Sequence, residues 1–208
     1  YAPSASPNER FHIMPREMSE QMIIEIVTGY KISAQNLRTA GLDGIEIVAS
    51  HGYLIGQFLN KNVNQRKDKY GGNFRNRYRI LDQIIDAVKD GSSHDMLVGV
   101  RLSGNEKEFQ GMELKGTLEL IEELNKNESI DYINVTAGTS AGLKGSTHIV
   151  PSMRFEPGYT LPLSQAIKDV SDKPVFVAGR INTPQLADKA LIQGSADMCG
   201  MTRAIISD

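Results

Sequence analysis

Residues suited to proton transfer and anion binding follow each of five apolar runs in this sequence. His and Tyr side chains can transfer protons, Arg can bind an anion, and Gly lets a ligand approach the backbone closely. These residues are His51 and Tyr53 after the first run, Arg101 at the end of the second, Thr136 and His148 after the third, Gly179 and Arg180 after the fourth, and Gly200, Thr202 and Arg203 after the fifth.

The turns after the last two apolar runs give the clearest indication of an anion-binding site. Gly179 and Arg180 form one strand-end turn, and "GMTRAII" from Gly200 forms another that opens a helix. A helix start offers unpaired N–H groups to a phosphate. A simpler interpretation is that these glycines only permit tight turns. Two successive turns that each contain an Arg favour the phosphate site.

The other candidates also have structural alternatives. Arg101 ends an apolar strand, where its charge needs either an internal ion-pair partner or a ligand anion. Tyr53 could be a packed core tyrosine, and His148 a polar loop residue. The four histidines form no HxH or HExxH motif and the single Cys199 forms no CxxC pair, so no catalytic metal is predicted.

The elements that must position these residues alternate along the chain. Short β-rich runs predict strands, and apolar residues at helical spacing predict the helices between them. The predicted strands span 44–48, 96–102, 131–138, 174–179 and 196–200. Ser19 and Gly41 delimit one helix, Thr183, Pro184 and Gly194 delimit another, and further helices are expected around 74–88, 114–124 and 163–170. A long Gly-rich loop is expected over 137–159.

This βα rhythm predicts an α/β fold with a parallel sheet, either an open doubly wound sheet or part of an eight-stranded barrel. In both folds ligands bind at the carboxyl ends of the strands, where the candidate residues lie.

Composition narrows the partner class. The 208 residues are 40% hydrophobic and have a formal net charge of −2 with interspersed signs, so neither nucleic acid nor an anionic membrane is an expected partner. A small-molecule substrate is expected. The single cysteine, the absence of a membrane-length apolar run and the absence of a signal-peptide pattern favour a cytoplasmic protein. The opening "YAPSASPNER" leads into a helix as if from mid-domain, which is typical of a fragment.

The stretch "GLDGIEIVASHGYLIGQFLNKNVNQRKDKYGGNFRNRYRI" resembles the Old Yellow Enzyme family of NADH:flavin oxidoreductases, whose pattern is close to DGVEIxxxxGYLxxQFLxxxxNxRxDxYGGxxxNRxRF. The resemblance continues through "APSA", "GVRLSG", "DYINVTAG" and "VFVAGRINTPQLADKALIQGSADMCGMTRAIISD". The ending "ADMCGMTRAIISD" is most similar to the branch of 2,4-dienoyl-CoA reductase, trimethylamine dehydrogenase and N-methylproline demethylase-like enzymes.

The resemblance implies a (β/α)8 TIM barrel that binds FMN and is reduced by NADH or NADPH. Residues 1–208 would be the C-terminal part of this flavin-binding domain and supply strands four to eight. The 4Fe-4S cluster and FAD of the multidomain branch would lie outside this chain. Arg101 matches the arginine near the flavin pyrimidine edge, and the phosphate cradle matches Gly179, Arg180, Gly200, Thr202 and Arg203, with Thr202 replacing a commoner Gly.

Tyr53 matches the family's proton donor, and a Tyr with an ordinary pKa of about 10 is protonated at neutral pH. His51 matches a substrate-binding position, and His148 falls near the active-site His of the dienoyl-CoA reductases. Val48 departs from the His that classical ene reductases place there, so the paired grip on a substrate carbonyl is missing. The reaction is therefore predicted to be either reduction of an activated C=C bond or oxidative N-demethylation of an amine.

Two alternatives remain from the sequence. The chain could be a non-catalytic fragment or interaction module without its own flavin. A phosphate-binding aldolase would need a Schiff-base Lys at a strand end, whereas Lys144 falls in the expected loop. A homo-oligomeric assembly is also left open.

Overall fold

Five parallel strands form a single sheet in the order β1-β2-β3-β4-β5. The structure is a computed structural model, and it describes residues 1–207. The strands are β1 (Gly44–Val48), β2 (Leu97–Ser103), β3 (Tyr132–Thr136), β4 (Val175–Ala178) and β5 (Met198–Gly200). Each pairs in parallel with the next, which requires a crossover connection between consecutive strands. All five predicted strands are confirmed.

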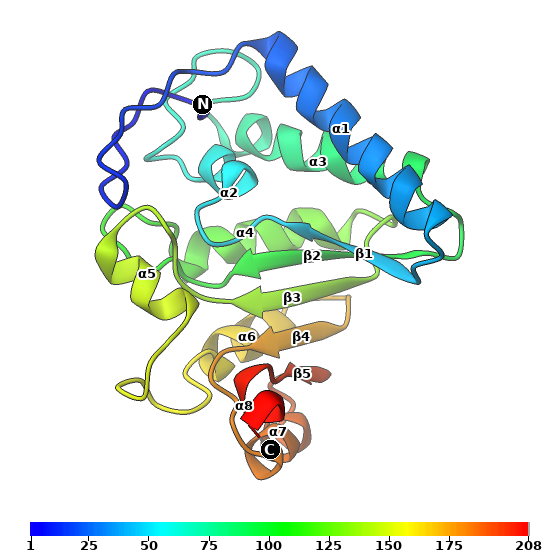
Figure 1. Ribbon diagram of the computed structural model, residues 1–208, viewed down its shortest axis with the longest axis vertical. Helices are drawn as coiled ribbons and strands as arrows, with labels where there is room; N and C mark the ends of the chain where they lie inside the picture. Colours follow the sequence, from blue (N-terminus) through cyan, green and yellow to red (C-terminus); the bar gives the residue numbers. More distant parts are fainter. Residues whose placement is uncertain (208) are drawn as a thin grey trace.

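Helices alternate with the strands along the chain, and several of them cover one face of the sheet (Figure 1). They are α1 (Glu20–Thr39), α2 (Leu54–Leu59), α3 (Phe74–Gly91), α4 (Leu114–Asn125), α5 (Leu143–Ile149), α6 (Leu161–Lys168), α7 (Pro184–Ile192) and α8 (Arg203–Ser207). The predicted caps are confirmed: Ser19 Oγ accepts the Met22 N–H, and Thr183 Oγ1 accepts the Leu186 N–H. Gly41 follows α1 with φ +76°.

The core lies between the sheet and these helices. Strand register aligns one apolar layer across four strands, namely Ile47, Val100, Ile133 and Val175. All four side chains are at most 1% exposed. This burial on the helix side explains why the strands read as short continuous apolar runs.

The opposite face of the sheet is partly exposed. Leu97 and Met198 on this face are 52% and 53% exposed. Strands of an all-parallel sheet are normally covered on both faces. This uncovered face fits an arc of an eight-stranded barrel with the face toward the barrel axis, in which the resemblance implies that these are strands four to eight.

Two helices were not predicted. α2 follows β1 directly, and α5 occupies part of the expected 137–159 loop. His148 and Lys144 consequently lie on a helix rather than in a loop, which corrects the prediction. In Figure 1, α5 lies beyond the carboxyl ends of the strands, so it borders the edge where ligands bind in parallel α/β folds.

Candidate functional site

The carboxyl ends of the strands converge on one cleft of about 790 Å³. Sites for small molecules and cofactors typically have volumes of roughly 300–1,000 Å³. Every predicted site residue except Tyr53 lines this strand-end cleft: His51, Arg101, His148, Gly179, Arg180, Gly200, Thr202 and Arg203. Thr136, the further strand-end residue noted in the sequence, lines it too.

His51 lies at the junction between β1 and α2. It is 9% exposed, adopts φ +60°, and its backbone N–H donates to Ser103 Oγ at 3.0 Å. Burial lowers the pKa of His51, and the nearby Arg101 charge lowers it further, while the carbonyls of Gly138 and Ala137 partly oppose the shift. Its Nδ1 atom is buried without a hydrogen-bond partner. His51 is thus a neutral imidazole at neutral pH, and one of its ring nitrogens has no hydrogen-bond partner.

Tyr53 faces a different space. It is 52% exposed and lines a second cavity of about 540 Å³, here called the Tyr53 cavity. Its ring contacts His51 edge-on, with ring centroids 6.2 Å apart and planes at 79°. The alternative of a packed core tyrosine is excluded by this exposure. His51 and Tyr53 therefore stand at the boundary between the two spaces.

His148 projects from α5 into the strand-end cleft. Its Nδ1 lies 3.0 Å from the Lys144 carbonyl oxygen, and its ring packs edge-on against Phe155 at 4.7 Å. The Tyr159 hydroxyl donates to the His148 carbonyl oxygen, and burial raises the pKa of Tyr159 to about 12. The remaining ring nitrogen, Nε2, is the atom of His148 that could exchange a proton with a ligand.

Arg101 has the internal ion-pair partner that was one of the two alternatives left open by the sequence. Its Nη2 lies 2.5 Å from Glu46 Oε1, so the internal ion pair exists. Its Nε is nevertheless buried without a hydrogen-bond partner, and the side chain lines the strand-end cleft. Because a guanidinium has five N–H donors, the ion pair with Glu46 leaves capacity for a ligand anion.

Gly179 and Arg180 form a crowded turn after β4. A Cβ atom at Gly179 would lie 2.1 Å from Thr160 Oγ1, so only glycine fits there. Arg180 has φ +53°, its Nη1 donates to the Ser152 carbonyl oxygen at 2.9 Å, and its Nε is buried without a partner. This turn is a close-packed cradle with an unsatisfied cationic donor.

The β5 turn adds the second arginine. Arg203 Nη2 donates to the Pro151 carbonyl oxygen at 2.9 Å, beside the Ser152 carbonyl that Arg180 holds. α8 has only five residues, so the predicted helix is present but short. Residues 151 and 152 thus link the two arginines across the cleft.

This donor set fits the FMN that the resemblance implies. The two orphaned guanidinium N–H groups, on Arg101 and Arg180, need acceptors that are anionic or strongly polar. A phosphate and an electron-rich ring edge supply such acceptors.

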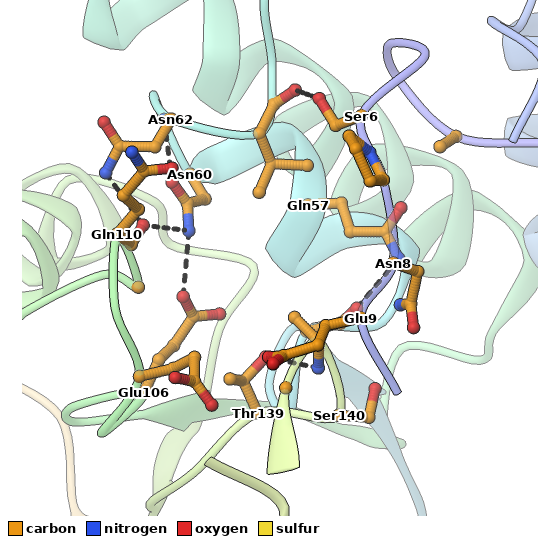
Figure 2. Close-up of a pocket in the computed structure, with 18 of the residues that line it drawn as sticks. Ser6, Asn8, Glu9, Gln57, Asn60, Asn62, Glu106, Gln110, Thr139 and Ser140 are labelled. Carbon is orange, nitrogen blue, oxygen red and sulfur yellow. Dashed lines mark hydrogen bonds between the residues drawn. The ribbon is translucent and has the colours of Figure 1, made fainter. Parts of the chain in front are cut away.

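The Tyr53 cavity differs in charge (Figure 2). It is lined by Glu9, Glu106 and Glu108, and none of the described residues that line it is Lys, Arg or His. Glu106 is 3% exposed, and its Oε2 accepts from Asn60 Nδ2 at 2.9 Å and from the Met112 N–H at 2.6 Å. Burial raises the pKa of Glu106. The cavity therefore favours a cationic or neutral occupant over an anion.

Sequence reasoning missed Glu46, Asn134 and Thr160. Glu46 and Asn134 interrupt the apolar strands β1 and β3, and this polar alternation was the available signal. Thr160 carried no signal because its contact with Gly179 depends on how α6 packs.

Residues 1–207 contain no group of three or more His, Cys, Asp or Glu side chains that could hold a metal ion. Over the same residues, every helix is too short or too polar to cross a membrane.

A family model described as "NADH:flavin oxidoreductase / NADH oxidase family" matches residues 2–208. A "Metal reductase" of Desulforamulus reducens is 35% identical over 208 residues, which are 100% of this chain and 30% of that protein. Among solved structures, histamine dehydrogenase from Rhizobium sp. 4-9 matches with a TM-score of 0.87 and 26% identity over 100% of this chain and 30% of its own. A 2-naphthoyl-CoA reductase complex matches with a TM-score of 0.86 and 27% identity over 95% of this chain and 30% of its own. The chain therefore spans about a third of the length of these relatives.

Proposed function

Because the chain belongs to the NADH:flavin oxidoreductase / NADH oxidase family, as its resemblance to the Old Yellow Enzymes indicated, we propose that it is part of an FMN-dependent oxidoreductase reduced by NADH or NADPH. Residues 1–208 form the C-terminal part of its flavin-binding barrel domain. The observation that carries the proposal is the strand-end cleft, where Arg101 and Arg180 present buried guanidinium N–H groups without partners.

The proposed roles of the residues follow from their positions. Bound FMN supplies a flavin N5 that exchanges a hydride with the substrate. Gly179, Arg180, Gly200, Thr202 and Arg203 would hold the phosphate of bound FMN. Arg101 would supply positive charge that stabilises the reduced ring.

Proton handling falls to His51, Tyr53 and His148. Neutral His51 accepts or donates a hydrogen bond through a ring nitrogen, and Tyr53 offers its Oη proton from the Tyr53 cavity, where its ring contacts that of His51. His148 offers Nε2 from the α5 side. One His and one Tyr can polarise and protonate a substrate, although Val48 leaves no second His for a bidentate grip.

The acidic Tyr53 cavity favours the amine reaction over the enoyl-CoA reaction. An ammonium group is attracted by Glu9 and Glu108 and can stack on an aromatic ring such as Tyr53 or Phe109. A CoA thioester carries several phosphate charges, which these carboxylates repel. Oxidation of a C–N bond in a small amine is therefore the proposed direction, with C=C reduction as the second candidate.

Absorption of the purified native protein tests the cofactor. We expect the absorption bands of an oxidised flavin, release of FMN on denaturation, and bleaching on anaerobic addition of NADH or NADPH. A colourless protein that takes up no FMN would favour the alternative of a non-catalytic barrel fragment.

Anaerobic reduction of the bound flavin by a panel of amines, set against reoxidation of the reduced flavin by enoyl compounds, tests the direction. Glu108→Gln should raise KM for amines about tenfold and leave KM for a neutral enone unchanged, because only the amine carries charge. Glu122→Gln, an exposed α4 variant with the same charge change, is the control. Equal effects of Glu108→Gln on both substrate classes would argue against the amine assignment.

A further inference from the structure

We propose that Glu46 is a positioning residue for Arg101, which fixes the guanidinium at the cleft and limits the positive charge that a ligand there experiences. The proposal rests on the proposed function, because the ligand it concerns is the flavin ring. Glu46 lies on β1 and is not among the residues that line the strand-end cleft, so it would act on the ligand only indirectly, by positioning Arg101.

Strand register brings the two residues together. Val48 pairs with Arg101, and Arg101 pairs with Asn134. Paired residues of a parallel sheet share a face, and so do residues two apart in one strand. Glu46, Arg101, Asn134 and Tyr132 therefore all project from the face toward the barrel axis, opposite the apolar core layer.

The carboxylate of Glu46 is held from two neighbouring strands. Its Oε1 receives Arg101 Nη2 at 2.5 Å. Its Oε2 accepts from Asn134 Nδ2 at 2.8 Å and from the Tyr132 hydroxyl at 3.2 Å. A carboxylate with three donors has little freedom to rotate, so it fixes one arm of the guanidinium.

Space for this cluster is provided by Gly99. A Cβ atom there would lie 2.0 Å from the Tyr132 ring, so β2 must have glycine where the ring crosses it. Tyr132 also stacks on Phe176 with centroids 4.6 Å apart, which fixes the ring from the β4 side. Burial and the Glu46 carboxylate together raise the pKa of Tyr132 to about 12, so its hydroxyl stays a donor to Glu46 at neutral pH.

The cluster leaves specific groups unsatisfied. Arg101 Nε and Asn134 Oδ1 are both buried without partners. Arg101 also lines the strand-end cleft, and its side chain is 37% exposed. Glu46 thus engages one nitrogen of Arg101 and leaves the other donors for the cleft.

The second consequence of the ion pair between Glu46 and Arg101 is a smaller net positive charge at the cleft. Glu46 offsets part of the Arg101 charge, and an uncompensated guanidinium would stabilise an electron-rich ring more strongly. Glu46→Gln should therefore shift the midpoint potential of bound flavin to a more positive value. The same change should lower the pKa of His51 further, because the Arg101 charge already lowers it. The other ionisable groups that line the cleft are His148, Tyr159, Arg180 and Arg203.

The experiment compares Glu46→Gln with Glu122→Gln in the native protein by flavin potentiometry and by NMR titration of His51 in the flavin-free form. We expect a positive potential shift and a lower His51 pKa in the first variant only. Glu46→Asp keeps the charge but shortens the reach to Arg101, so it should give a smaller shift in the same direction, and it decides the question if Glu46→Gln does not fold.

The outcomes separate the two proposals. Flavin-loaded Glu46→Gln protein with the potential and His51 pKa of the control would overturn the role of Glu46. A protein that binds no flavin would contradict the proposed function, while the His51 titration would still test the link from Glu46 through Arg101.

Discussion

His51 and Tyr53 meet edge-on, with ring centroids 6.2 Å apart, although one is 9% exposed and the other 52%. Two residues of one turn therefore open onto different spaces, His51 onto the strand-end cleft and Tyr53 onto the acidic cavity beside it. The turn therefore holds a buried neutral imidazole and an exposed phenol edge to edge, each directed to its own space.

His51 should make stability depend on pH on the acid side. Its pKa is lowered in the folded state by burial and by Arg101, so the unfolded chain binds the proton more readily. As pH falls below about 6.5, the ordinary pKa of His, the free energy of unfolding should therefore decrease. Above that pH the contribution is constant. Urea unfolding between pH 5 and 8 should show a steeper acid-side loss for the native protein than for His51→Gln. Parallel curves would contradict the assignment.

Tyr53→Phe should slow proton delivery and leave flavin reduction by NADH or NADPH intact. Loss of a positioned general acid typically costs about 100-fold or more in rate. We expect a decrease of that size in turnover with an enone, measured by stopped-flow reoxidation of the reduced flavin. Tyr30→Phe removes a hydroxyl from α1 and should leave this rate unchanged. Full turnover by Tyr53→Phe would exclude Tyr53 as the proton donor.

Gly179→Ala should destabilise the protein and weaken FMN binding. The new Cβ would lie 2.1 Å from Thr160 Oγ1 and 2.7 Å from Thr160 Cβ, and Thr160 is fully buried. Overpacking of this kind typically costs about 1–3 kcal/mol. Thermal unfolding and FMN titration measure the two effects.

Gly29→Ala is the matched control for that substitution. Gly29 lies inside α1, and a Cβ atom added there would find open space within 4 Å, so alanine meets no obstacle. Alanine in a helix interior is favoured over glycine by about 0.8–1 kcal/mol, so this variant should be more stable than the native protein. Equal behaviour of the two alanine variants would mean that the Gly179 turn is not tightly packed.

Arg66→Ala should release the N-terminal segment. The Arg66 side chain is 4% exposed, and its Nη1 donates to the carbonyl oxygens of Pro3 at 3.0 Å and Met18 at 2.7 Å. Its Nη2 lies 2.5 Å from Asp68 Oδ2. Breaking a buried ion pair typically costs about 3–5 kcal/mol. Denaturant unfolding should show a loss of that order, whereas the exposed Arg75→Ala should change stability little.

The ion pair between Arg66 and Asp68 predicts a second pH dependence of the free energy of unfolding, at acid pH. The hydrogen bond from Arg66 is the main cause of the lowered pKa of Asp68. The stabilisation by the Arg66–Asp68 pair is therefore complete above the ordinary Asp pKa of about 3.9. It is lost as pH falls through the lower pKa that Asp68 has in the folded protein. Comparison of native protein and Arg66→Ala below pH 4 should show their stabilities converging.

Local pattern sufficed for the strands and the long helices. Alternating βα rhythm, the caps at Ser19 and Thr183, and glycines such as Gly41 are features of neighbouring residues, so the sequence alone predicts them. It also predicts that strand-end residues gather, because parallel strands align their carboxyl ends.

The two missed helices depend on tertiary contacts. α2 has six residues, mostly apolar, with no clear period. α5 contains Gly145, where a Cβ atom would lie 2.5 Å from Thr139 Cγ2, so α5 forms where the chain packs against the β3 loop rather than through helix propensity. A local reading of a Gly-rich segment favours a loop.

What the sequence determined by itself is the set of chemical groups, their order along the strands and their shared edge of the sheet. Only the tertiary structure decided their partners: Glu46 beside Arg101, Thr160 against Gly179, and Tyr53 in a separate cavity from His148. The physical reason is that strand register and helix packing join residues far apart in the chain, and those contacts set charge, burial and hydrogen bonding at the site.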